Sequence, residues 1–147
     1  MASGFMQRFK GRIQAGVIYL GAGGIIDALS GNTIFTASAG GIPKYSVEDG
    51  ITAFAGGGQT SAYQLTKAIS RIATVASAND SVKLPASEVG MEVVVVNDAA
   101  SNAAKVYGKG TDTIDAVASA TGNALAAGKR ATYTCYLAGK WVSQVGA

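Results

Sequence analysis

The sequence predicts an all-β protein, in which a β-sandwich or barrel-like domain follows an extended, glycine-rich N-terminal arm. Between residues 80 and 141, short apolar runs alternate with turns rich in Gly, Asn, Asp and Ala, which is typical of a compact β domain. Before residue 62, clusters of glycine and other turn-forming residues interrupt the chain repeatedly. We therefore expect an arm over residues 1–55 and an all-β domain over residues 56–147.

Composition restricts the classes of function. The net charge is +3, from 12 basic and 9 acidic side chains without a basic block, so we expect no nucleic-acid binding. Charged residues are 14% of the chain, against about 25% in a typical domain. So few charges suit a chain that buries much of its surface against copies of itself or a partner. A small soluble domain with long Gly/Ala loops is the alternative.

The chain contains no histidine and a single cysteine, Cys135. The usual general base at neutral pH is therefore missing, and neither an intrachain disulfide nor a cysteine-based zinc site can form. We expect no enzyme activity, no catalytic residues, no cofactor, no metal and no small-molecule substrate.

An apolar run from residue 13 to 26 follows a basic start. With the A-x-A motif at residues 37–39 it has the outline of a secretory signal. The glycines inside the run make a poor signal helix, and Asp27 separates the run from the motif, so we predict a segment of the mature protein. The run is also shorter and more broken than the roughly 20 apolar residues that span a bilayer, so no membrane contact is expected.

The same segment predicts contacts with a partner or with sister subunits, because an exposed apolar arm would otherwise promote aggregation. Its glycines favour an extended segment over a helix. An edge strand and loop of the same core is the other interpretation. The candidate contact residues are Phe5, Arg8, Phe9, Lys10, Arg12, Ile13, Val17, Ile18, Tyr19, Leu20, Ile25 and Ile26.

The elements of the domain follow from side-chain alternation. Short β-like pieces are expected at residues 33–36 and 51–54, and a flexible joint at residues 56–61. Residues 63–75 fit helical spacing at first, but the β-branched residues from Ile69 onward favour a strand.

The central part of the domain alternates more clearly. Val82 and Leu84 should face the core in a strand that ends at Pro85. Residues 91–96 include four consecutive valines, which predict a central strand buried on both faces. Shorter strands are expected at residues 105–107 and 111–117, and Ile114 is the best core residue of the second.

The C-terminal part predicts a hairpin. Tyr133, Cys135 and Leu137 should share one face, and a turn at residues 138–140 leads to Trp141. Tyr136 and Trp141 are candidate interface anchors. Trp141 fits equally well as the core plug of this hairpin. Cys135 is interpreted as a small core residue, because no histidine is present to activate it.

Glycine and carboxylate clusters predict turns rather than ligand sites. Residues 56–60 lack the lysine and spacing of a P-loop, and residues 21–24 lack the flanking strand and helix of a dinucleotide site. Asp112 and Asp115 lie close in sequence, and residues 97–98 fall in a loop, without the ordered oxygen ligands of a calcium site. We interpret these polar residues as turn and loop caps.

Three sequence blocks carry a resemblance to a known class of proteins. They are RIATV with DSVKLP at residues 71–75 and 80–85, VVVVNDAASNAAKVY at residues 93–107, and LAAGKRATYTCYLAGKW at residues 125–141. Together they resemble a β domain of tailed-bacteriophage structural proteins, namely capsid decoration (cement) proteins, head fibres and related virion proteins. The resemblance covers about residues 56–145. It implies a sandwich or barrel-like unit, often trimeric, on the outer capsid surface, without catalytic residues.

By this resemblance the chain is expected to be a decoration protein, made in the host cytoplasm and carried on the outer surface of the virion head. Its partners would be the major capsid protein and its own copies in a homotrimer. Such a protein stabilises the capsid lattice through buried area rather than chemistry. The alternative is a head-fibre or tail-associated module that contacts the host surface, which calls for an exposed cluster of aromatics or a longer fibre partner. A secreted bacterial surface module with residues 1–39 removed is a third interpretation.

Overall fold

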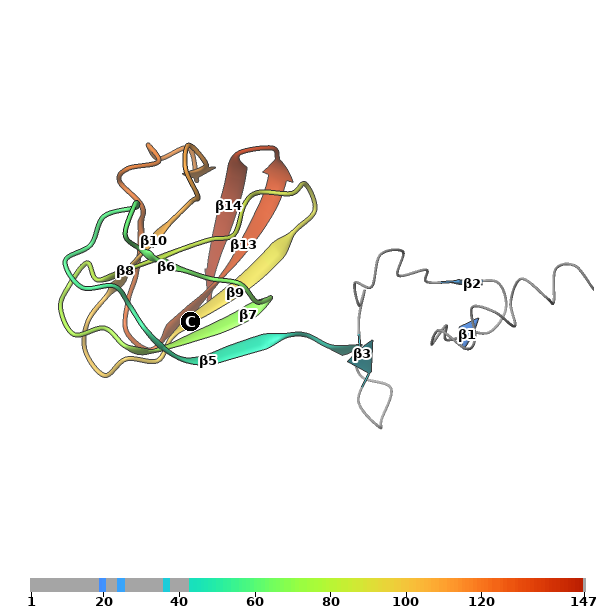
Figure 1. Cartoon of the computed structure of the whole chain (residues 1–147), viewed down its shortest axis with the longest axis horizontal. Helices are drawn as coiled ribbons and strands as arrows, with labels where there is room; N and C mark the ends of the chain where they lie inside the picture. The colour runs from blue at the N-terminus through green and yellow to red at the C-terminus, as the bar shows by residue number, and fades with distance from the viewer. Residues whose placement is uncertain (1–18, 21–23, 26–35, 38–42, 147) are drawn as a thin grey trace, which may run out of the picture. The chain divides into compact units, whose positions relative to one another are not determined.

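The computed structural model describes residues 19–20, 24–25, 36–37 and 43–146 (Figure 1). The chain divides into two compact units, Met1–Lys44 and Tyr45–Ala147. In the described residues no helix is long and apolar enough to cross a membrane. The first unit contains two short antiparallel pairs, which are β1 (Tyr19–Leu20) with β2 (Gly24–Ile25) and β3 (Thr36–Ala37) with β4 (Pro43–Lys44).

The second unit is a β-solenoid of about four turns. A six-stranded sheet in the order β11-β14-β13-β9-β7-β5 and a four-stranded sheet in the order β12-β10-β8-β6 supply its strands. These strands are β5 (Val47–Thr52), β6 (Tyr63–Gln64), β7 (Ile69–Thr74), β8 (Ser81–Lys83), β9 (Glu92–Asn97), β10 (Ala104–Tyr107), β11 (Thr113–Ile114), β12 (Asn123–Leu125), β13 (Lys129–Leu137) and β14 (Lys140–Gly146).

Successive turns stack through parallel strand pairing. Each of the first three turns gives one strand to each sheet, so that β5, β7 and β9 pair in parallel in the larger sheet and β6, β8 and β10 in the smaller one. The chain then reverses, because β12 and β13 run antiparallel to β10 and β9. The antiparallel β13–β14 hairpin and β11, which is parallel to β14, complete the larger sheet (Figure 1).

The all-β prediction is confirmed, but the predicted sandwich or barrel is wrong. Alternation of apolar and polar residues identifies strands and their inward faces, but the same alternation occurs in an antiparallel sandwich and in a parallel solenoid. A solenoid is recognised in a sequence by a repeat of fixed length. Here the equivalent positions Val47, Ile69 and Val94 are unevenly spaced, so the repeat is not visible.

One hydrophobic core lies inside the turns. Val82 and Leu84 are fully buried and Ile114 nearly so, which confirms their predicted positions. β7 confirms the strand predicted from Ile69 onward. Leu65 and Ile72, two residues of the partly helical spacing, are both buried, Leu65 directly after β6 and Ile72 in β7.

Two burial predictions are wrong. In β9 only Val93 and Val95 are buried, while Val94 and Val96 are half-buried, because residues 45–146 of the second unit do not cover the opposite face of the six-stranded sheet. In β13 Leu137 is 56% exposed, unlike Tyr133 and Cys135 on the face predicted for it. The strand register shifts between Cys135 and Leu137, and this irregularity turns Leu137 outward.

The compact unit starts before residue 56, where the sequence placed the domain boundary. β5 lies in the six-stranded sheet, and Ile51 and Ala53 are buried in the core. The expected joint at residues 56–61 is a largely exposed loop of the first turn, held by hydrogen bonds from the Gly56 amide to Asp80 and from Gln59 Nε2 to the Gly108 carbonyl. Gly57 has φ +70°, and a Cβ there would meet the Asn79 carbonyl oxygen at 2.9 Å. The β-like piece expected at residues 33–36 falls outside the described residues except for Thr36, which begins β3.

Asn97 is the polar side chain whose loss should weaken the solenoid most clearly. Its Nδ2 donates to the Asn102 and Leu125 carbonyl oxygens at 2.9 and 2.8 Å, and its Oδ1 accepts from the Ala99 amide at 3.2 Å. We expect Asn97→Ala to lower the free energy of unfolding by about 2–3 kcal/mol, because buried backbone groups lose their partners. Urea denaturation measures this.

The matched control is Gln144→Ala, which truncates an exposed amide side chain on β14 and should change the free energy of unfolding by less than about 0.5 kcal/mol. Equal effects of the two substitutions would contradict a structural role for the buried amide of Asn97.

Candidate interaction surfaces

The predicted contact residues of the N-terminal segment fall largely outside the described part of the chain. Tyr19 and Leu20 lie in β1 and Ile25 lies in β2, and these strands pair with each other. The remaining predicted contact residues, which lie outside the described residues, are Phe5, Arg8, Phe9, Lys10, Arg12, Ile13, Val17, Ile18 and Ile26. Their predicted contacts with a partner or sister subunit stay predictions.

Trp141 is the core plug of the last hairpin, the second of its two interpretations. Its side chain is 1% exposed, and its Nε1 donates to Asp112 Oδ2 at 3.4 Å. Cys135 is its register partner on β13 and is a free, buried thiol. Because Trp141 has almost no accessible surface, it cannot anchor an interface. Tyr136, the other candidate anchor, is 58% exposed.

The carboxylates considered for a cation site hold backbone instead. Asp115 has φ +51° and accepts hydrogen bonds from the Ser143 amide at 2.7 Å, the Ser143 hydroxyl at 2.5 Å and Asn123 Nδ2 at 2.7 Å. It thereby fastens the turn after β11 to β14, in agreement with its interpretation as a cap. Among the described residues, no group of acidic or cysteine side chains is arranged to hold a metal ion.

Two buried polar residues at the corners of the solenoid were not identified as important from the sequence. Asp80 is 1% exposed, and its carboxylate accepts from the Gly56 amide at 3.1 Å and the Ser77 amide at 2.9 Å. Asn97 is fully buried, although the sequence placed it in a loop. Their position was the signal that could have identified them, because each of the two residues lies at the end of a strand with an apolar inward face. Such polar residues at a strand end satisfy backbone groups where the ladder stops.

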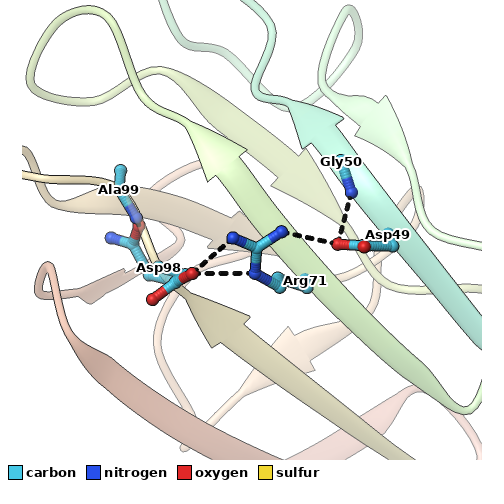
Figure 2. A network of polar contacts seen from close by, with 6 residues as sticks. Asp49, Gly50, Arg71, Asp98 and Ala99 are labelled. Carbon is cyan, nitrogen blue, oxygen red and sulfur yellow. Dashed lines mark hydrogen bonds and ion pairs between the residues drawn. The ribbon is translucent and has the colours of Figure 1, made fainter.

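An ion-pair ladder crosses three turns on the outside of the six-stranded sheet. Arg71 Nη1 lies 2.7 Å from Asp49 Oδ1, and Arg71 Nε donates to Asp98 Oδ2 at 2.8 Å (Figure 2). The hydrogen bond from Arg71 holds the pKa of Asp49 below its ordinary value. All three side chains are largely exposed, so the ladder contributes little to stability, and it neutralises Arg71 locally.

Exposed apolar side chains gather at the tip of the β13–β14 hairpin. We call Val89, Tyr136 and Leu137 the hairpin-tip patch; they are 66%, 58% and 56% exposed. The loop that carries Val89 is fastened to the hairpin, since the Gly90 amide donates to the Cys135 carbonyl at 2.8 Å. The Gly139 amide also donates to Ser87 Oγ at 2.9 Å. The patch is therefore presented by backbone that is held at two points.

A hollow in the described part of the surface offers little room for a small ligand. That hollow is bounded by Gly108, Asp112, Ile114 and Asn123 among others, and it is too small to admit a water molecule. Comparison with known protein families, with curated protein sequences and with solved structures gives no match for this chain. Interpretation of the surfaces therefore rests on the chemistry of the chain itself.

Glu48 provides a pH-dependent contact on the first turn. The Tyr63 hydroxyl donates to Glu48 Oε1 at 2.6 Å, and this hydrogen bond lowers the pKa of Glu48 from its ordinary value of 4.5. A carboxylate with a lowered pKa stabilises the fold above its unfolded pKa, and that stabilisation is lost as the pH falls through its folded pKa. We expect Tyr63→Phe to be less stable than the wild type at pH 7, and we expect this deficit to be smaller at pH 3.

Urea midpoints at the two pH values measure this difference. Tyr45→Phe removes the hydroxyl of another exposed tyrosine and should give no pH-dependent difference from the wild type. A Tyr63→Phe deficit that persisted unchanged at pH 3 would show that the ionised Glu48 is not the relevant partner.

Proposed function

We propose that this chain is a non-enzymatic structural subunit of a tailed-phage virion, a capsid decoration (cement) protein on the outer surface of the head. The hairpin-tip patch is the observation that carries the proposal. It supplies adjacent exposed apolar side chains, among them a tyrosine, on an anchored hairpin. Tyrosine is enriched among residues that dominate protein interfaces. The identity of the partner, the major capsid protein, comes from the sequence resemblance alone.

The anchoring of the patch favours protein binding for an energetic reason. Ordering a mobile loop on binding costs free energy, and a surface that is already fixed avoids that cost. The hydrogen bonds at Gly90 and Gly139 fix the two segments before any partner arrives. Three exposed side chains supply only part of a standard interface of about 1,600 Å². We propose that the N-terminal segment supplies further contacts with the capsid or with sister subunits.

The solenoid changes what the resemblance contributes. The resemblance implied a sandwich or barrel-like unit, and this chain does not form one. Its sequence blocks lie mainly on β7 to β10 and on β12 to β14, so they support the proposal as sequence and not as fold. The homotrimer and the virion location stay predictions made from those blocks.

A head-fibre or tail-associated module is the second candidate, and exposed aromatics on the first turn favour it. Phe54 forms an isolated bridge with Ser81, and Tyr63 pairs with Val82, so the two aromatics lie beside neighbouring positions of β8. Phe54 is 45% exposed and Tyr63 is 38% exposed. Such a pair suits contact with another molecule at the end of the solenoid, where the host surface would be bound.

The copy number of the chain in purified virions distinguishes these functions. We expect quantitative mass spectrometry to find the chain in near-stoichiometric ratio to the major capsid protein. A few copies per particle would indicate the fibre or tail position. Absence of the chain from virions would overturn both proposals.

A binding assay tests the hairpin-tip patch itself. We expect the double substitution Tyr136→Ala and Leu137→Asp to weaken binding to particles that lack the chain by about tenfold or more, the usual scale for an interface anchor. Tyr45→Ala is the control, since Tyr45 is equally exposed but lies at the start of the first turn. Equal binding of the double variant and the wild type would remove the patch from the interface.

A further inference from the structure

The outer face of the six-stranded sheet carries an uncharged row of side chains. Val47, Ile69, Val94 and Thr132 lie at one register level on the adjacent strands β5, β7, β9 and β13. All four alternate away from the core, and Val47 is 58% exposed. We call this set the outer row. Within the second unit, residues 45–146 place nothing over it.

Two opposite charges flank the outer row along the strands. Glu92 lies two residues before Val94 on β9 and is the register partner of Thr134. Arg130 lies on the other side of the row as the register partner of Val96. Arg71 also lies on that side, but it is already paired with two carboxylates, those of Asp49 and Asp98 (Figure 2). The levels of Glu92 and Arg130 are four residues apart on β9, or about 13 Å.

This charge pattern is self-complementary. Val94 and Thr132 are register partners midway between the two charged levels. A two-fold rotation about an axis that crosses the strands at this pair exchanges the two levels. Glu92 of one copy then lies over Val96 and Arg130 of the other, and the same contact repeats by symmetry. An interface of this kind uses the same patch on both molecules.

We propose that the outer face binds the outer face of a second copy of this chain, as a two-fold dimer centred on Val94 and Thr132. The uncharged outer row becomes the centre of the interface, and the two Glu92–Arg130 pairs lie at its margins. Charges at margins of this kind set orientation more than affinity. The proposal does not depend on the virion function, because it concerns only copies of the chain.

Strand addition at the sheet edge is a poorer way for copies to associate. β5 is the last strand in the order of the larger sheet, and its pairing with β7 is interrupted by a register shift between Glu48 and Ile51. At that point Asp49 Oδ1 accepts from the Gly50 amide at 2.7 Å, and Gly50 has φ +72°. A bulge with a charged residue is a common protection of an edge strand against pairing. Association through the face leaves this protected edge untouched.

The size of the face sets the expected strength. Five strands spaced by about 4.8 Å and six residues of about 3.3 Å give a flat area of roughly 480 Å² per copy. Two copies would bury about 1,000 Å², which is at the lower limit of specific interfaces. We therefore expect a reversible dimer whose population rises with protein concentration. A face covered by one copy has no room for another, so this contact gives two copies, in place of the homotrimer that the sequence resemblance implies.

Sedimentation of the full chain over a range of concentrations tests the proposal. We expect a monomer–dimer equilibrium, and we expect Val94→Lys to weaken it by at least about tenfold, because two lysines would meet at the axis. Val145→Lys is the matched control, since Val145 is 58% exposed, pairs with the core-facing Ala131 and not with the outer row, and should leave the dimer unchanged. A monomer at all concentrations, a trimer, or an unchanged dimer of Val94→Lys would overturn the proposal.

A charge-exchange experiment tests the orientation without relying on loss of association. Self-association should be weakened by Glu92→Arg alone and by Arg130→Glu alone. In either variant, both symmetry-related contacts would join two side chains of the same charge. An equimolar mixture of the two variants should form a heterodimer, in which both contacts join opposite charges again. Failure of the mixture to associate better than either variant would exclude the two-fold arrangement. Binding of the Val94→Lys variant to particles is measured separately. That measurement concerns the virion function, whereas the mixing experiment concerns only self-association.

Discussion

Backbone pairing between successive turns is the interaction on which the second unit depends. A solenoid has no single sheet that closes on itself, so each turn is stabilised by the turn before it and the turn after it. Parallel strands supply this pairing on both sides of the core, and the chain must turn corners between them. At each corner the ladder stops and leaves amides and carbonyls without strand partners. Asp80 and Asn97 meet that need with side chains that are buried among the turns.

The same stacking decides which side chains meet the outside. Because residues at equivalent positions stand above one another, a property that recurs from turn to turn becomes a continuous row. Recurrence of β-branched residues produces the outer row, and recurrence of charge produces the ladder through Arg71. A chain with few charges can thus present an uncharged surface on ordered strands. The hairpin that ends the stack breaks this regularity and carries its own exposed side chains.

Strands and inward faces could be predicted from the sequence, whereas their connection in space could not. Val82, Leu84 and Ile114 were assigned correctly because alternation reports burial directly. The solenoid was missed because parallel stacking depends on which strand pairs with which, and alternation carries no such information. Burial of the valine run on both faces was expected because four valines suit a covered strand, yet only one face of β9 is covered.

The interaction surfaces were predictable only in part. Tyr136 could be proposed as an anchor from its residue type, and its exposure allows that role. Trp141 has the same chemical character but points into the core, and the sequence left both interpretations open. The outer row could not be found from the sequence, since its members are distant along the chain and meet only through the strand register. The bulge that exposes Leu137 was likewise invisible, because a register shift depends on pairing geometry.

The burial of Trp141 makes the chain its own spectroscopic reporter. It is the only tryptophan of the sequence, and its indole ring is shielded from water at the end of the stack. Its emission in the folded protein should therefore be shifted toward shorter wavelengths and return to longer wavelengths when water reaches the ring. The signal comes from the last turn alone, whereas circular dichroism averages over every strand. Disagreement between the two would reveal that the stack opens from its C-terminal end before the remaining turns separate.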